Sequence, residues 1–111
     1  MSKIIIADDN EWHIDCIKDL LTLEGHTVEC ARDGEEAIMI ISEHVRNNIP
    51  IDLVITDMTM PKANGVAVAA AAKKAGAKKV IINSSYHADI PPMEGVVIIN
   101  KMDILKEIDE L

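Results

Sequence analysis

The chain has 111 residues with a net charge of −8, and about half of its residues are apolar, so it can form one domain, residues 1–111, with a single core. The negative charge argues against sequence-independent binding of nucleic acid and against binding to anionic membranes. No apolar segment has the length of a signal peptide or of a membrane span, so a cytoplasmic protein is expected.

Strand and helix patterns alternate along the chain. Short runs rich in Ile and Val predict buried strands of a parallel sheet, which cover residues 4–7, 27–31, 53–56, 80–83 and 96–99. Apolar residues at helical spacing predict helices that cover residues 11–24, 34–45, 65–75 and 103–111. In the second helix, the inward positions are expected to be Ala37, Ile38, Ile41 and Val45.

The ends of several helices are marked by suitable residues. Asn10 and Asp33 can cap the first two helices, and Asp103 can cap the last one. The connection at residues 85–95 contains two adjacent prolines, which leave room for about one helical turn. The fourth helix is therefore predicted to be vestigial. Alternating strands and helices with short links indicate an α/β fold with a doubly wound parallel sheet.

Acidic residues stand at the ends of two predicted strands. Asp8 and Asp9 follow the first strand, and Asp57 follows the third. Ligands bind at the carboxyl ends of the strands in an open α/β sheet, so these three carboxylates are expected to meet in one pocket. A single Asp after a strand is commonly only a turn former or a cap, but three like charges at close range need a positive group to offset them. Oxygen ligands alone favour Mg²⁺ over Zn²⁺.

The cysteines and histidines show no metal-ligand spacing. Cys16 lies on a predicted helix and Cys30 on a predicted strand, and both are interpreted as reduced, small core residues. The histidines are scattered singly, which favours surface or edge positions for His13, His26, His44 and His87.

Taken together, these residues resemble the receiver domain of two-component response regulators over the whole chain. The resemblance rests on Asp8-Asp9, on Asp57 followed by Met60-Pro61 and Gly65, and on Ser84 and Lys101 at the fourth and fifth strands. It implies a flavodoxin-like fold with strand order 2-1-3-4-5. It also implies a signalling switch that accepts a phosphoryl group from a sensor histidine kinase or a phosphotransfer protein, and not an enzyme acting on a separate substrate.

The resemblance assigns a role to each of these residues. Asp57 would be the phosphoacceptor, with Lys101 and Ser84 binding the phosphoryl oxygens. Asp8, Asp9, Asp57 and the backbone carbonyl of Thr59 would hold Mg²⁺ or Mn²⁺, with Asp8 bound directly or through water. Pro61 and Gly65 would shape the loop of the site. Movement of Ser84 towards the phosphoryl group would be the switch.

The sequence departs from the family pattern in its last third. Met102 follows Lys101 where the family usually has a proline after a cis bond, and a cis bond before Met would cost about 2.5–4 kcal/mol, so a trans bond is expected. Ile98 stands where the family often has an aromatic residue, and the fourth helix is truncated. These departures leave the phosphorylation chemistry intact and alter the part of the domain that carries the signal to partners.

Three other functions are alternatives to a switch controlled by phosphorylation. A degenerate receiver would bind partners constitutively without phosphorylation. An aspartate-nucleophile phosphatase of the haloacid dehalogenase type needs Asp-x-Asp after the first strand, whereas Asp8 and Asp9 are adjacent and Thr59 stands two positions after Asp57. A flavin-binding module needs a phosphate-binding loop rich in Ser, Thr and Gly after the first strand, and none is present.

Overall fold

The computed structural model describes residues 2–60, 62–84 and 93–100. The expected helix at 103–111, and the residues Pro61, His87, Lys101 and Met102, lie outside these ranges.

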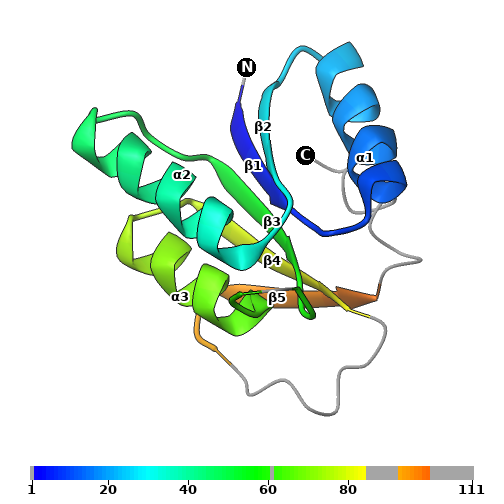
Figure 1. Cartoon of the computed structure of the whole chain (residues 1–111). Helices are drawn as coiled ribbons and strands as arrows, with labels where there is room; N and C mark the ends of the chain where they lie inside the picture. Colours follow the sequence, from blue (N-terminus) through cyan, green and yellow to red (C-terminus); the bar gives the residue numbers. More distant parts are fainter. Residues whose placement is uncertain (1, 61, 85–92, 101–111) are drawn as a thin grey trace.

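A five-stranded parallel sheet forms the centre of the molecule (Figure 1). Its strands are β1 (Lys3–Ala7), β2 (Thr27–Ala31), β3 (Leu53–Asp57), β4 (Lys79–Ser84) and β5 (Val96–Asn100). They lie side by side in the order β2-β1-β3-β4-β5, and every neighbouring pair is parallel. The predicted strand order and flavodoxin-like architecture are confirmed.

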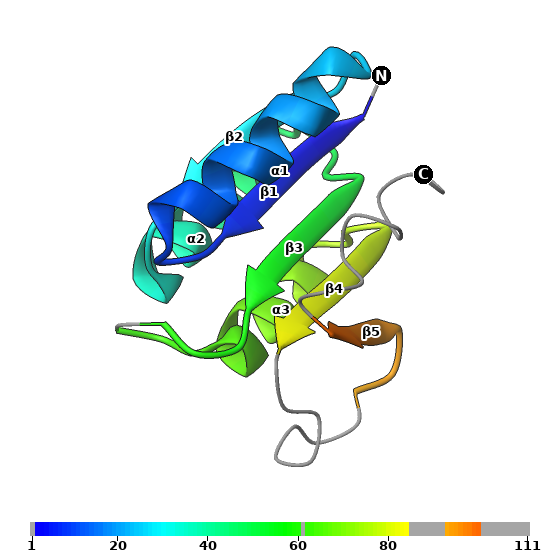
Figure 2. The same cartoon turned by 90° about the vertical axis from the view of Figure 1, so that its right-hand side faces the viewer.

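Helices cover both faces of this sheet. They are α1 (Glu11–Leu23), α2 (Gly34–Arg46) and α3 (Gly65–Lys74). Helix α1 lies on one face, while α2 and α3 lie side by side on the other (Figures 1 and 2). Two of the predicted caps are confirmed, because the side chains of Asn10 and Asp33 accept hydrogen bonds from the backbone N–H groups of His13 and Glu36. The third, Asp103, lies outside the described residues.

The core is aliphatic and consists of two clusters, one on each face of the sheet. Alternate residues of each strand point to opposite faces, so neighbours such as Ile5 and Ile6 belong to different clusters. Leu21 of α1 packs in the cluster on its own face, and Val68 of α3 packs in the other. This alternation determines on which face of the sheet each residue at the end of a strand lies.

The buried face of α2 differs from the prediction. Val45 is 53% exposed, whereas His44 is only 5% exposed. Each helical residue turns by about 100°, so Ala37, Ile41 and His44 form one stripe and Val45 lies to its side. One ring nitrogen of His44 is paired, because its Nδ1 lies 2.8 Å from the carbonyl oxygen of Ile40. Its Nε2 lies 3.2 Å from a carboxylate oxygen of Glu29, but the two atoms do not form a hydrogen bond.

The interpretation of the cysteines is wrong for one of them. Cys16 lies on the exposed side of α1. Cys30 on β2 is half-buried against the cluster below α1, and this burial raises the pKa of its thiol above its usual value. Cys16 is exposed because it lies on the side of α1 that faces away from the sheet, and Cys30 is only half-buried because β2 is an edge strand.

Between β4 and β5, the described residues form a turn. The backbone N–H of Val96 donates to the carbonyl of Met93 over 3.1 Å, and Gly95 takes a positive φ of 77°. Residues 85–92 of this connection lie outside the described ranges. Three helices accompany the five strands in the described part of the chain, which agrees with the predicted truncation of the fourth helix.

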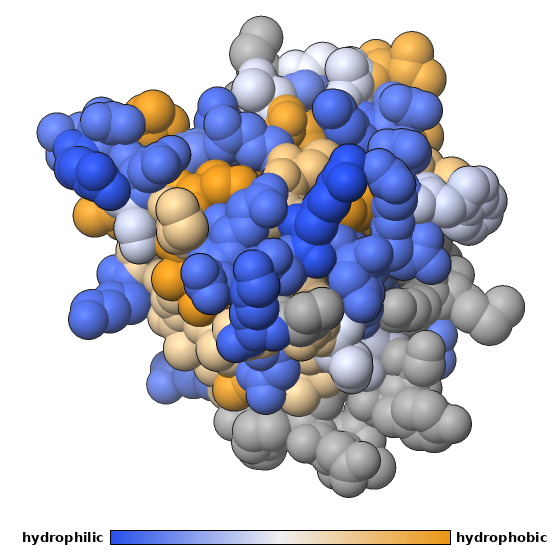
Figure 3. Space-filling view, viewed as in Figure 1, coloured by the Kyte–Doolittle hydropathy of each residue, from blue (hydrophilic) through white to orange (hydrophobic). Residues whose placement is uncertain are grey.

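The outer surface over α2 and α3 mixes charged and apolar side chains (Figure 3). A hollow of about 330 Å³ lies between the two helices and is lined by Ile41, Ser42, Val45, Ala71, Lys74 and Ala75. No helix in the described ranges is both long and apolar enough to cross a membrane.

Candidate functional site

Three aspartates meet at the carboxyl ends of β1 and β3. Asp8 and Asp9 directly follow β1, and Asp57 is the last residue of β3, which pairs with β1. Each of the three offers a carboxylate oxygen that lies within 4.8 Å of those of the other two. Asp8 and Asp57 are buried, while Asp9 is exposed. The predicted convergence of the three side chains is confirmed.

The carboxylate of Asp8 is held at both of its oxygens. Oδ1 accepts a hydrogen bond of 2.9 Å from the backbone N–H of Asn10. Oδ2 lies 2.5 Å from Nδ1 of His13, which stands one turn into α1. Asn10 also caps α1, so the short loop after β1 both orients the side chain of Asp8 and begins the helix.

Asp57 is fixed by the backbone around it. Its Oδ1 accepts a hydrogen bond of 2.8 Å from the N–H of Met58. The hydroxyl of Thr56 donates to the carbonyl of Asp57 over 3.0 Å. The N–H of Gly65 then donates to the carbonyl of Met58 over 2.8 Å, which brings the start of α3 against the end of β3.

This close approach requires a glycine at position 65. A Cβ atom there would lie 2.5 Å from the carbonyl oxygen of Asp57 and 2.8 Å from the Cα of Met58. Both are backbone atoms, so neither can rotate away. The sequence predicted that Gly65 shapes this loop, and the contacts explain why no side chain fits.

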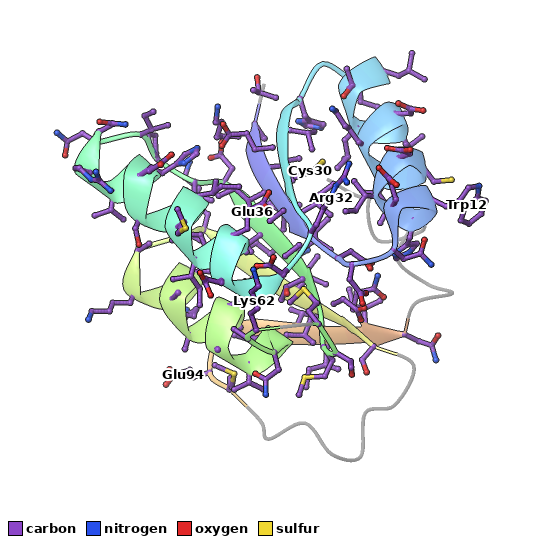
Figure 4. The ribbon with its side chains drawn as sticks, in the orientation of Figure 1. Trp12, Cys30, Arg32, Glu36, Lys62 and Glu94 are labelled. Carbon is purple, nitrogen blue, oxygen red and sulfur yellow. The ribbon has the colours of Figure 1, made fainter. Side chains whose placement is uncertain are left out.

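The loop between β3 and α3 is anchored at several points. The side chain of Thr59 is exposed, whereas Met60 is buried in the core cluster under α2 and α3. Lys62 has a positive φ of 72°, and its Nζ lies 3.7 Å from a carboxylate oxygen of Asp33 at the start of α2 (Figure 4). Asn64 caps α3 by accepting from the N–H of Ala67.

Two polar side chains stand at the end of β4. Ser84, the predicted hydroxyl, is 6% exposed and is the last residue of β4. Asn83 is 1% exposed and pairs with Asp57 in the register of β3 and β4. The predicted Lys101 follows β5 and lies outside the described residues.

The acidic cluster fits a hard divalent cation. Mg²⁺ binds oxygen at about 2.1 Å, so neighbouring ligands of an octahedral ion lie about 3 Å apart and opposite ligands about 4.2 Å apart. The three carboxylate oxygens, all within 4.8 Å of one another, are close enough to draw together around one ion. The donors are oxygens alone, which favours Mg²⁺ or Mn²⁺ over softer metals.

Two residues beside the aspartates were missed by the sequence analysis. His13 was expected at the surface, but it is half-buried against Asp8. Its signal was its position one turn after the cap Asn10. Asn83 was taken as the end of a strand, although a polar residue directly after Val80-Ile81-Ile82 interrupts an apolar run. Neither signal reveals what the side chain contacts.

Comparison with known proteins gives a consistent family. The family model described as "Response regulator receiver domain" matches residues 4–110. The transcriptional regulatory protein CpxR of Escherichia coli (strain K12) is 30% identical over 96 residues, which are 86% of this chain and 39% of CpxR. The chain therefore spans less than half the length of this curated relative.

Solved structures with a similar fold belong to the same kind of domain. The receiver domain of the hybrid histidine kinase CckA is 26% identical, with a TM-score of 0.76, and the match covers 97% of this chain and 96% of that chain. The response regulator protein TrrA of Thermotoga maritima, solved in complex with Mg²⁺ and BeF, is 29% identical, with a TM-score of 0.75. That match covers 99% of this chain and 97% of TrrA.

Proposed function

Because the chain belongs to the response regulator receiver domain family, we propose that it is a signalling switch controlled by phosphorylation of Asp57. The observation that carries the proposal is the cluster of Asp8, Asp9 and Asp57, whose carboxylate oxygens lie within 4.8 Å of one another. Such a cluster provides both a nucleophile and the ligands of a cation that can neutralise a phosphoryl group.

The proposed reaction transfers a phosphoryl group from a phosphohistidine. A carboxylate oxygen of Asp57 attacks the phosphorus atom and forms a new oxygen–phosphorus bond. The phosphorus–nitrogen bond to the donor imidazole breaks, and its electron pair stays on the imidazole nitrogen. The hydrogen bond from Met58 N–H to Oδ1 holds the carboxylate at a fixed angle during this attack.

Asp8, Asp9, Asp57 and the backbone carbonyl of Thr59 would hold Mg²⁺ or Mn²⁺ in this site. When bound, the cation supplies charge stabilisation for the phosphoryl oxygens during transfer. His13 and the N–H of Asn10 keep Asp8 oriented towards the cluster. TrrA was solved with Mg²⁺ and BeF, which supports the same requirement in this chain.

Lys101 and Ser84 would bind the phosphoryl oxygens on the side of β4 and β5. The lysine contributes a compact positive charge, and the serine contributes a hydroxyl donor. Ser84 would move to hydrogen-bond a phosphoryl oxygen, and this movement is the proposed switch.

The partners of this function are proposed from its chemistry. A sensor histidine kinase or a phosphotransfer protein supplies the phosphoryl group in the cytoplasm, and a protein that distinguishes the two states of the domain receives the signal. The domain itself turns over no separate substrate, apart from its own phosphorylation and dephosphorylation. A net charge of −8 speaks against direct contact with nucleic acid or with an anionic membrane.

Intact-mass analysis after incubation with acetyl phosphate and Mg²⁺ tests the proposal. One added phosphoryl group is expected, and the Asp57→Asn variant should gain none. Asp19→Asn, which removes an exposed carboxylate of α1, is the matched control and should be labelled like the wild type. Labelling that persists in Asp57→Asn would contradict the assignment, and no labelling of the wild type would favour a degenerate receiver.

A further inference from the structure

Two apolar surfaces stay uncovered in the part of the chain that the structure describes. One is the outer side of α1, where Trp12 is 74% exposed and Leu23 is 85% exposed. The other lies between the ends of α2 and α3, where Val45 and Ile49 are exposed. Large apolar side chains that gather at the surface are typical of a site where another protein binds.

The outer side of α1 is an apolar stripe with an acidic residue beside it. Trp12, Cys16 and Leu23 are exposed, and their spacing along the helix places them on one side of it. Figure 4 shows Trp12 pointing away from the sheet. Asp15, one turn after Trp12, is also exposed and forms no ion pair with any of the described residues. The stripe therefore joins apolar side chains to an unpaired negative charge.

The surface between α2 and α3 is a trough. The hollow of about 330 Å³ described above adjoins a second hollow of about 320 Å³, because Val45 and Ala75 line both. Apolar patches lie between charged side chains on this face of the molecule (Figure 3). A groove between two helices can take the apolar side of a third helix. The second hollow is lined by His44, Val45, Asn48, Ile49, Pro50 and Ala75.

A positive charge stands at the side of the trough. Lys74 lines the first hollow, and no ion pair joins it to another residue of the described ranges. A lysine in the last turn of a helix interacts favourably with the helix dipole, which by itself explains the charge. The dipole gives no reason for the exposed Val45 and Ile49 in the same trough. The two features together fit a partner with apolar and acidic side chains.

We propose that α1 of one copy of the chain binds in the trough of a second copy. Trp12 and Leu23 supply the apolar side chains, and Asp15 supplies a carboxylate that pairs with Lys74. Helix α1 lies on one face of the sheet and the trough on the other, so the two surfaces cannot meet within one molecule (Figures 1 and 2). The contact is therefore head-to-tail, and it leaves a free trough at one end and a free α1 at the other.

Sedimentation velocity of the whole chain tests this contact, without a phosphodonor and with a reductant that keeps Cys16 from cross-linking two copies. The average mass should rise with concentration beyond that of a dimer, because each added copy offers a new free surface. Trp12 is the single tryptophan of the chain, so its fluorescence should move to shorter wavelength over the same concentrations as it becomes buried.

Two variants each disable one surface. Trp12→Ala removes the largest apolar side chain of α1, and Val45→Glu puts a negative charge into the trough. Each should weaken the association on the order of 30-fold. Both side chains are exposed, so the fold does not depend on them. The matched control is Met39→Glu, which changes an exposed residue of α2 that lines neither hollow and should associate like the wild type.

A mixture of the two variants tests the direction of the contact. Trp12→Ala keeps an intact trough and Val45→Glu keeps an intact α1, so together they should form a dimer that cannot extend. Only Val45→Glu contains a tryptophan in this mixture, and its fluorescence should shift when Trp12→Ala is added.

Exchange of charges tests the ion pair. Lys74→Glu should weaken the association by roughly twofold to fivefold, because an exposed pair contributes little. The double variant Asp15→Lys/Lys74→Glu should recover the wild-type affinity to within about twofold. No recovery would overturn the pairing of Asp15 with Lys74.

Three results would overturn the head-to-tail contact. They are a monomeric mass at every concentration, association that Trp12→Ala or Val45→Glu leaves unchanged, and a mixture of these two variants without a fluorescence shift. A monomeric wild type would assign the trough to a different protein. None of these measurements involves phosphorylation of Asp57, so the proposed function is tested separately.

Discussion

Replacing Asp9 with Asn should stabilise the metal-free chain and weaken its response to Mg²⁺. In the absence of a cation, Asp9 adds a third negative charge to the cluster with Asp8 and Asp57. Removing that charge relieves repulsion in the folded state. With Mg²⁺ present, the same substitution removes a ligand, so the wild type should gain more stability than the variant.

The size of the first effect follows from the geometry. Two unit charges that are 4.8 Å apart repel each other by about 0.9 kcal/mol at the dielectric constant of water. Asp9 takes part in two such pairs, and its exposure argues for the value in water. Salt with a Debye length of about 8 Å roughly halves the sum, so Asp9→Asn should raise the free energy of unfolding by about 1 kcal/mol in a chelator. Mg²⁺ at 100 times its Kd should add about 2.7 kcal/mol to the wild type.

Urea unfolding with and without Mg²⁺ measures both effects in one experiment. Asp19→Asn is the matched control, because it removes the same charge from an exposed position of α1 away from the cluster. The reasoning is refuted if Asp9→Asn lowers the free energy of unfolding in chelator, or if it raises it no more than Asp19→Asn does. Equal Mg²⁺ responses of the wild type and Asp9→Asn would remove Asp9 from the metal site.

Three further outcomes are expected. Gly65→Ala should lower the free energy of unfolding by about 1–3 kcal/mol, measured by urea unfolding, because its Cβ would lie 2.5 Å from the carbonyl oxygen of Asp57; an unchanged midpoint would show that the loop yields. The backbone N–H of Lys3 and the ammonium of Lys78 lower the pKa of Asp52. Its contribution to stability is therefore present above about pH 4 and is lost as the pH falls through the lowered pKa. The difference in unfolding free energy between the wild type and Asp52→Ala should narrow below about pH 4, and a constant difference would contradict this assignment. A thiol reagent at pH 8 should modify Cys16 before Cys30, because Cys16 is exposed while burial raises the pKa of the Cys30 thiol. Peptide mass analysis measures the order of modification, and modification of Cys30 first would contradict this prediction.

The order of strands and helices could be predicted because it depends on local patterns. Apolar runs and helical spacing are properties of neighbouring residues, and the predicted elements match the observed ones to within about two residues at most ends. Convergence of Asp8, Asp9 and Asp57 also followed from the sequence, because parallel strands of one sheet must end at one edge.

Side-chain partners across the fold depended on the tertiary structure. The contact of His13 with Asp8 requires the rotation of α1, and the burial of His44 in place of Val45 requires the rotation of α2. These rotations are set by packing against the whole sheet, which no local pattern contains.

The sequence by itself determined the fold class, the order of the elements and the edge at which the acidic residues gather, since each of these follows from periodicity and from the direction of parallel strands. The tertiary structure alone decided that Gly65 lies against the backbone of Asp57 and that Asn83 stands in register beside the same residue, with an oxygen that has no hydrogen-bond partner in the described part of the chain. The physical reason is that both facts join segments far apart in the chain, and only the packed register of β3, β4 and α3 brings their atoms together.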